Sequence, residues 1–192
     1  MTAGWTSDQR TSGTVDHQSF ARTGVPFRDD ADTRRADAGT IGRIQLDTNT
    51  LLTVRASLMR EWRTRWFEEE REGDRRAGIF ADVAVTKSLA KHVMTGGVAF
   101  DRDQYAALDT RNSYRYTTPA VYGEHTWTPM PWFGVTSSAR LDLTEFGDFV
   151  SPRVSILVRP TDAWTVRLAR ATGVYTPTPM TDETEAFGLR YV

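Results

Sequence analysis

The clearest alternation of apolar and polar residues in the chain is Trp132-Phe-Gly-Val-Thr-Ser-Ser-Ala-Arg-Leu-Asp-Leu143. One parity of this stretch is apolar and contains Phe133, Val135, Ala139, Leu141 and Leu143. The other parity is polar and contains Gly134, Thr136, Ser138, Arg140 and Asp142. Successive side chains of a strand point to opposite faces of a sheet, so the stretch predicts a strand with one apolar and one polar face. Two similar runs follow after the short turns 145–148 and 160–163, so residues 132–175 are predicted to form a β-meander.

Runs with the same alternation occur upstream. Residues 51–67 place Leu52, Val54, Ala56, Leu58, Trp62 and Trp66 on one parity, over about three times the length of a usual globular strand. Further strands are expected near 33–46, 76–87, 92–105 and 120–128, with charged or polar loops at 67–75 and 106–118. Residues 1–32 are polar and show no period, which predicts a loop or a disordered N-terminal segment. The fold class is therefore all-β, an antiparallel up-and-down meander of about eight long strands.

Composition excludes some functions. The net charge of -1 lacks the basic excess that a nucleic-acid partner requires, and the absence of cysteine excludes disulfides and thiol chemistry. No apolar run reaches the roughly 18–20 residues of a membrane helix, and the N-terminal stretch lacks the apolar core of a signal peptide. A content of 39% hydrophobic and 26% charged residues fits a soluble protein. It also fits a β-barrel with a polar lumen, because only alternate residues of a barrel strand face lipid.

The placement of loops and tryptophans favours the membrane. Connections at one end of the predicted strands are short, whereas those at the other end, apart from 145–148, are longer or more charged, as in outer-membrane barrels. Trp127, Trp132 and Trp164 lie beside short turns, whereas Trp62 and Trp66 lie about 11 to 15 residues along residues 51–67 from the nearest short turn. A membrane strand crosses the hydrocarbon in about 9–11 residues, so these tryptophans predict two interfacial girdles. The alternative is that they cap the core of a soluble β-sandwich.

Five motifs follow one another in the second half of the chain: Ser137-Ser-Ala-Arg-Leu-Asp142, Glu145-Phe-Gly-Asp-Phe149, Ser151-Pro-Arg-Val-Ser155, Arg159-Pro-Thr-Asp-Ala-Trp-Thr-Val-Arg167 and Thr176-Pro-Thr-Pro-Met-Thr-Asp-Glu-Thr-Glu185. In this order they resemble the barrel of TonB-dependent outer-membrane receptors. The upstream motifs Arg34-Arg-Ala-Asp-Ala-Gly39 and Leu51-Leu-Thr-Val-Arg-Ala-Ser57 resemble the same family, so the likeness covers residues 33–192.

The resemblance implies a receptor of about 22 strands with an internal plug, which imports a scarce ligand such as a ferric siderophore or cobalamin. It places the protein in the outer membrane of a Gram-negative cell, with membrane lipid, the small ligand and TonB (through the plug) as partners. The chain departs from this pattern because it contains no plug, TonB box or signal peptide. We therefore expect residues 33–192 to be a partial receptor barrel, a fragment that is not competent for transport alone.

Arginines of the polar parity bear on whether this fragment closes. Seven of them would face the lumen: Arg55, Arg63, Arg65, Arg140, Arg153, Arg159 and Arg167. An eight-stranded barrel has a narrow, filled interior, and these side chains would crowd it with too few carboxylates. The sequence thus predicts an open, curved sheet that is part of a larger transmembrane barrel, rather than a small closed pore.

Candidate ligand contacts gather at the long-loop rim. Aromatic and guanidinium groups there could meet an aromatic or anionic ligand, and we assign this role to Tyr105, Arg111, Tyr114, Arg115, Tyr116 and Tyr175. The competing interpretation is an interfacial girdle with ordinary loop packing.

Catalytic and metal chemistry find little support in the sequence. His17, His92 and His125 lack metal-ligand spacing, and the acidic run containing Asp182, Glu183 and Glu185 lacks a calcium-loop pattern. Ser138, Asp142 and His125 could be named as a triad, but no nucleophile turn surrounds the serine. The sequence predicts a protein that is not an enzyme and needs no cofactor. The rival hypothesis is a soluble or secreted β-sandwich binding module.

Overall fold

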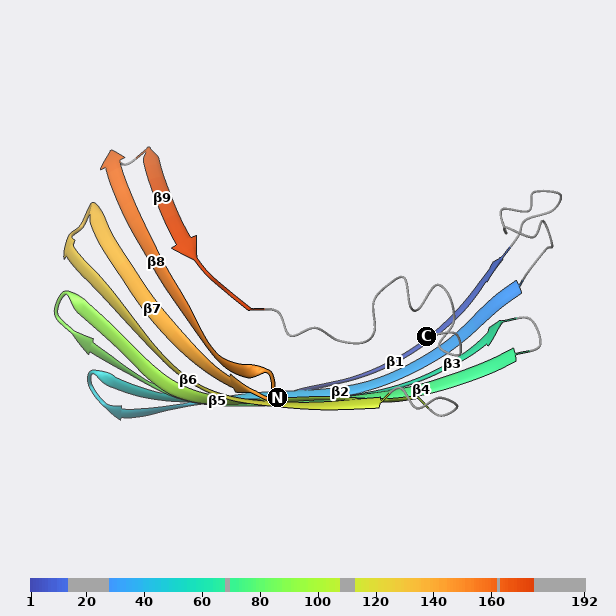
Figure 1. The fold of residues 1–192 in the computed structure, drawn as a ribbon. Helices are drawn as coiled ribbons and strands as arrows, with labels where there is room; N and C mark the ends of the chain where they lie inside the picture. The colour runs from blue at the N-terminus through green and yellow to red at the C-terminus, as the bar shows by residue number, and fades with distance from the viewer. Residues whose placement is uncertain (14–27, 68–69, 108–112, 162, 175–192) are drawn as a thin grey trace.

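The computed structural model describes residues 1–13, 28–67, 70–107, 113–161 and 163–174, and these residues form one antiparallel sheet (Figure 1). Its strands are β1 (Thr2–Gly13), β2 (Arg28–Asp47), β3 (Thr50–Phe67), β4 (Glu70–Leu89), β5 (His92–Ala107), β6 (Ser113–Met130), β7 (Phe133–Thr144), β8 (Gly147–Thr161) and β9 (Trp164–Ala171). Each strand pairs only with its neighbours in sequence. The predicted all-β, up-and-down architecture is confirmed, with nine described strands in place of about eight.

The sheet is strongly curved and open. Figure 1 shows the strands as an arc, with β1 toward one end and β9 at the other. Strands β1 and β9 are the two edges of the sheet and do not pair with each other within the described part of the chain. A concave face and a convex face result, and the alternation of side chains assigns every strand residue to one of them.

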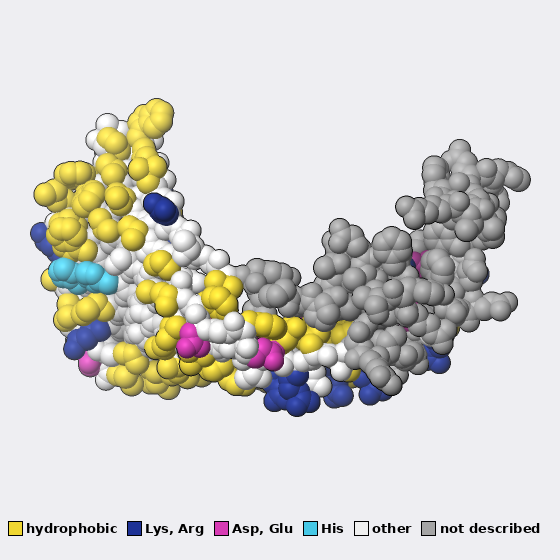
Figure 2. Space-filling view, viewed as in Figure 1, with side chains coloured by type: hydrophobic (Ala, Val, Ile, Leu, Met, Phe, Trp, Pro, Cys, Tyr) yellow, Lys and Arg dark blue, Asp and Glu magenta, His cyan; other side chains and the backbone are white. Residues whose placement is uncertain are grey.

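Apolar side chains occupy the convex face and remain exposed. Val121 is 49% exposed, Val150 62% and Leu168 67%, and no large side chain is fully buried among the described residues. Figure 2 shows hydrophobic side chains spread over the outer side of the sheet. A soluble β-sandwich would need a second sheet against this face, but the described strands all belong to one layer. Within these residues no helix is long and apolar enough to cross a membrane.

The predicted N-terminal loop is wrong for the parts of residues 1–32 that the structure describes. Residues 2–13 form β1, and β2 begins at Arg28, five residues before the expected strand. β1 pairs with β2 over its whole length, from Thr2 opposite Gly39 to Gly13 opposite Arg28. Near the loop end, both strands carry polar residues on both faces. Their pairing rests on backbone hydrogen bonds, and their sequences show no apolar alternation from which a strand could be predicted. Residues 14–27 lie outside the described part.

The two expected long loops are also largely strand. β4 begins at Glu70, inside the predicted loop 67–75, and Ser113 begins β6 inside the predicted loop 106–118. Charged residues continue the ladder there because they meet opposite charges across it: Arg63 lies opposite Asp74, and Arg65 lies opposite Glu72. The tryptophans occupy both ends of the strands as predicted, with Trp127 and Trp164 beside short turns and Trp62 in the far half of β3.

Candidate functional site

The centre of the concave face is a hydrogen-bonded network that crosses four strands. Asp82 of β4 is only 3% exposed and accepts a bond from Arg55 Nε of β3 at 2.9 Å. The Tyr122 hydroxyl of β6 donates to the same carboxylate at 2.7 Å. Tyr122 reaches Asp82 by passing over Gly97 of β5, where an added Cβ would lie 2.6 Å from the phenol carbon Cζ. The network lines a cavity of about 380 Å³.

Four of the seven predicted lumen arginines pair with carboxylates, although the sequence predicted too few carboxylates for the seven. The pairs are Arg55 with Asp82 at 2.9 Å, Arg63 with Asp74 at 2.8 Å, Arg65 with Asp29 at 2.7 Å and Arg140 with Asp142 at 2.8 Å. Three of these partners lie on a neighbouring strand, so the register decides the pairing. Sequence parity alone could not show it. Low dielectric around such groups makes a paired arginine far less costly than an unpaired one.

Three predicted lumen arginines lie apart from these pairs. Arg153 and Arg159 of β8 and Arg167 of β9 line a second concave cavity of about 370 Å³, at the short-turn end of the sheet. No carboxylate pairs with any of the three within the described residues. Glu124 lines the same cavity and is the carboxylate that shares it with them.

The structure brings three of the predicted ligand-contact residues together. Tyr105 of β5 lies directly opposite Tyr114 of β6, and their rings stack with centroids 5.6 Å apart. Tyr116 stacks on Tyr114 at 4.7 Å, and the ring of Phe146 contacts Tyr116 edge-on at 5.3 Å. We call Tyr105, Tyr114 and Tyr116 the tyrosine cluster. The three rings lie side by side on the concave face near the loop end, where Tyr105 is buried and Tyr114 and Tyr116 are half-buried.

An ion pair adjoins the tyrosine cluster. Arg76 of β4 makes two bonds to Asp103 of β5, at 3.0 and 3.2 Å, and the Tyr114 hydroxyl donates to Asp103 at 3.3 Å. Sequence reasoning missed Arg76, Asp103 and Phe146 because the register and a distant turn place them beside the tyrosines. The half-buried rings of Tyr114 and Tyr116 can stack on an aromatic ligand, and the exposed Arg76 can donate hydrogen bonds to an anionic one.

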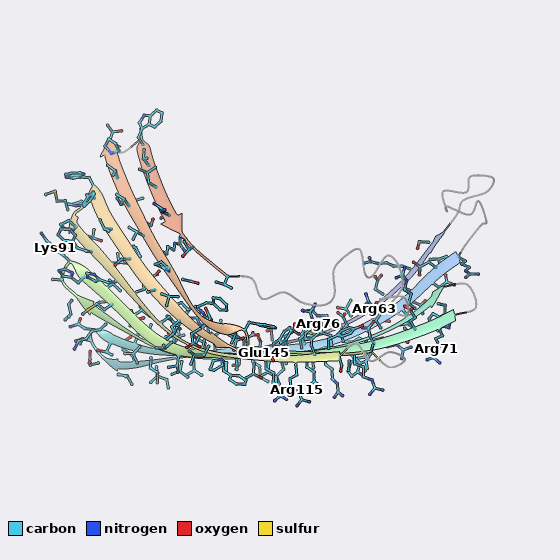
Figure 3. All side chains as sticks on the ribbon, viewed as in Figure 1. Arg63, Arg71, Arg76, Lys91, Arg115 and Glu145 are labelled. Atoms are coloured by element: carbon cyan, nitrogen blue, oxygen red, sulfur yellow. The ribbon has the colours of Figure 1, made fainter. Side chains whose placement is uncertain are left out.

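The remaining predicted site residues do not join the cluster. Arg115 follows Tyr114 in β6 and therefore points to the opposite, convex face; Figure 3 shows it on the outer side of the sheet, whereas Arg63 and Arg76 lie on the inner side. Arg111 and Tyr175 lie outside the described residues, as do His17 and the acidic residues Asp182, Glu183 and Glu185.

Two histidines are neighbours in space. His92 Nδ1 and His125 Nε2 are 2.9 Å apart and the rings stack at 5.2 Å, because β5 and β6 pair here. The described residues contain no group of three or more acidic or histidine side chains that could hold a metal ion. The register also separates the suggested triad: Ser138 and Asp142 share the concave face, whereas His125 lies on the convex face.

Comparison with known proteins supports the fold and goes no further. No family model matches the sequence, and no curated protein matches it. Among solved structures, the siderophore receptor PirA from Pseudomonas aeruginosa is similar at 14% identity with a TM-score of 0.52, over 80% of this chain and 37% of that one. The ferric citrate transporter FecA is similar at 12% identity with a TM-score of 0.47, over 74% of this chain and 27% of that one. The chain thus spans little more than a third of PirA, and its curved sheet has the fold of part of an outer-membrane β-barrel wall.

Proposed function

We propose that this chain forms part of the wall of a transport receptor barrel in the outer membrane of a Gram-negative cell. Its convex face lies against lipid and its concave face lines the lumen. The observation that carries the proposal is a single curved sheet whose apolar side chains are exposed on the convex side, while ion pairs occupy the concave side. In water such an apolar face would far exceed the patch that monomeric soluble proteins expose.

The finer assignment is a TonB-dependent receptor for a scarce ligand, such as a ferric siderophore or cobalamin. It is supported by the motif series of residues 137–185 and by the fold likeness to PirA. Within the complete receptor, the wall contributes ligand contacts and coupling to TonB belongs to the plug. The described strands leave two unpaired edges, which are costly in hydrocarbon, so this part of the wall is not expected to transport alone.

Site-directed spin labelling tests the orientation of the two faces. The chain has no cysteine, so single substitutions give unique labels without removing a native thiol. Val121→Cys places a label on the convex face of β6, and Thr118→Cys places the matched label on the concave face of the same strand. In lipid vesicles, the label at position 121 should collide with oxygen dissolved in lipid, and the label at 118 with a water-soluble nickel chelate. The opposite accessibilities would overturn the assignment.

The ligand-contact role of the tyrosine cluster is tested separately in the complete receptor. The probes are a ferric catecholate, a ferric hydroxamate, ferric citrate and cobalamin, each measured by equilibrium binding. Tyr116→Ala removes a ring that stacks on Tyr114, and such a change should weaken the bound probe about tenfold. Arg115→Ala is the control because its side chain lies on the other face. Equal losses in the two variants, or no loss with any probe, would exclude the cluster as the contact.

A further inference from the structure

Four arginines form a compact group on the convex face, which we call the convex arginine band: Arg60 of β3, Arg75 of β4, Arg102 of β5 and Arg115 of β6. Arg60 lies opposite Ala77, which lies opposite Gln104, which lies opposite Arg115. Three strand spacings separate the ends of this row, or roughly 14 Å. Arg75 lies two residues from Ala77 and Arg102 lies two residues from Gln104, so both point to the same face as the row. Figure 2 shows Lys and Arg side chains gathered on the outer side of the sheet.

Four concave arginines, Arg55, Arg63, Arg65 and Arg140, pair with carboxylates, whereas the band has no acidic partner among the described residues and is similar in this respect to Arg153, Arg159 and Arg167. Within the described residues, none of its four members makes an ion pair with a carboxylate. Arg60, Arg75 and Arg115 are exposed and Arg102 is half-buried. On the same face, Asp30 and Asp32 of β2 pair with Arg28 and Arg34. Asp148 of β8 also has the convex parity, but it lies two strands away from Arg115. Several like charges therefore lie close together without a described carboxylate partner.

The position of the band along the strands indicates the source of that charge. Arg60 lies ten residues beyond Thr50, the start of β3, and Arg102 lies ten beyond His92, the start of β5. At about 3.3 Å per residue and a tilt near 40°, ten residues rise roughly 25 Å, the height of the apolar band of a barrel. Arg102 lies opposite Ile79, which lies opposite Leu58, so the band begins in the row that holds the last exposed aliphatic side chains of β3 and β4. This is the level of lipid headgroups.

An interfacial tryptophan marks the same level. Trp62 lies directly opposite Arg75, and the guanidinium of Arg60 lies over the Trp62 ring, 5.2 Å from its centroid. Indole rings prefer the boundary between hydrocarbon and headgroups. Guanidinium groups bind phosphate oxygens through paired, charge-assisted hydrogen bonds, and a planar guanidinium suits this geometry better than an ammonium does.

We propose that the convex arginine band is a binding site for the phosphate groups of anionic lipids at the membrane surface. Neighbouring lipid phosphates supply the negative charge that no described carboxylate provides to these four arginines. The inference rests on the proposed function, because it requires the convex face to lie in a bilayer. It goes further by naming the residues and the class of lipid that hold this part of the wall at one depth.

Vesicle partitioning tests the band on the full chain. The vesicles are phosphatidylcholine alone, and phosphatidylcholine with a minor fraction of phosphatidic acid, whose headgroup is a phosphate monoester. The double variant Arg102→Gln, Arg115→Gln is compared with Arg153→Gln, Arg167→Gln, which removes the same charge from the concave face. Each arginine near an anionic surface strengthens partitioning roughly fivefold. The preference of the native chain for vesicles that contain phosphatidic acid over pure phosphatidylcholine should therefore be more than ten times that of the Arg102, Arg115 variant. The concave control should keep the native preference.

Each other outcome counts against a particular claim. Insertion of the native chain into both vesicles without any preference would overturn the band and leave the wall assignment standing. Equal loss in both double variants would assign the preference to net charge and overturn the band. Inorganic phosphate that competes at the concentration of the lipid phosphate would identify a site for the free ion, and not for lipid. Failure of the native chain to insert into either vesicle would overturn the wall assignment and the band with it.

Discussion

Gly97 is expected to be the most sensitive glycine of the described sheet. The phenol of Tyr122 crosses directly over it to reach Asp82, and a Cβ at this position would lie 2.6 Å from the phenol oxygen and 2.8 Å from the carbonyl oxygen of Val83. The tyrosine could swing aside, but only by giving up its bond to Asp82. The Val83 oxygen belongs to the backbone of β4 and cannot move without disturbing the ladder. Gly97→Ala therefore loses a hydrogen bond and gains strain.

The magnitude follows from those two contributions. A hydrogen bond to a charged group contributes about 1.5–3 kcal/mol, and overpacking of a tight site costs about 1–3 kcal/mol, so we expect a loss of roughly 2–5 kcal/mol. Gly96→Ala is a matched control, because the neighbouring glycine faces the convex side and nothing lies within 4 Å of the added carbon. Its cost should be close to zero.

The assay is reversible urea unfolding of the chain in detergent micelles, followed by tryptophan fluorescence. A double-mutant cycle with Tyr122→Phe then isolates the hydrogen bond, since Gly97→Ala should cost less once the hydroxyl has been removed. Equal stabilities of the Gly96→Ala and Gly97→Ala variants would contradict the close approach of Tyr122 to Gly97. So would a Gly97→Ala cost that is the same with and without the Tyr122 hydroxyl, because the effect would then be unrelated to Asp82.

Three further changes probe the faces and turns. Val98 is 57% exposed on the convex face, so Val98→Lys should weaken insertion into vesicles by about 2–4 kcal/mol, whereas Asp101→Lys on the concave face of the same strand should not. Asp103→Asn removes the carboxylate that accepts hydrogen bonds from Arg76 and Tyr114, and should lower the free energy of unfolding by about 1 kcal/mol in the urea assay. Asp101→Asn should change it little. Ala90 has a φ of 47°, so Ala90→Gly should raise the melting temperature slightly by relieving left-handed strain. A lower melting temperature would contradict that last expectation.

Alternation of side chains carried most of the fold prediction. The apolar parity of residues 132–143 and 51–67 identified long strands with one apolar face, and short turns between them required neighbouring strands to be antiparallel. These are local properties, so the sequence displays them directly. Strands that are polar on both faces could not be predicted from this alternation. Residues 2–13 and 70–75 are held by pairing to a neighbour, and no period in their own sequence records that pairing.

The candidate site divides in the same way. Tyr114 and Tyr116 share a parity, so sequence reasoning could place them on one face; the same parity puts Arg115 on the other, although grouping by proximity along the chain had joined all three. Tyr105, Arg76 and Asp103 come to the site through the register of β4, β5 and β6. Phe146 arrives from the turn between β7 and β8.

Which side chains can share a face follows from their order in the chain, because the period of a strand is a property of the backbone. Which strands lie side by side, and in which register, becomes visible only in the folded sheet. A shift of one residue between β3 and β4 would separate Arg55 from Asp82 and Arg63 from Asp74. The ion pairs of Arg55 and Arg63, and the lack of such pairs for the convex arginine band among the described residues, are therefore consequences of register, which arises from contacts between residues distant in the chain.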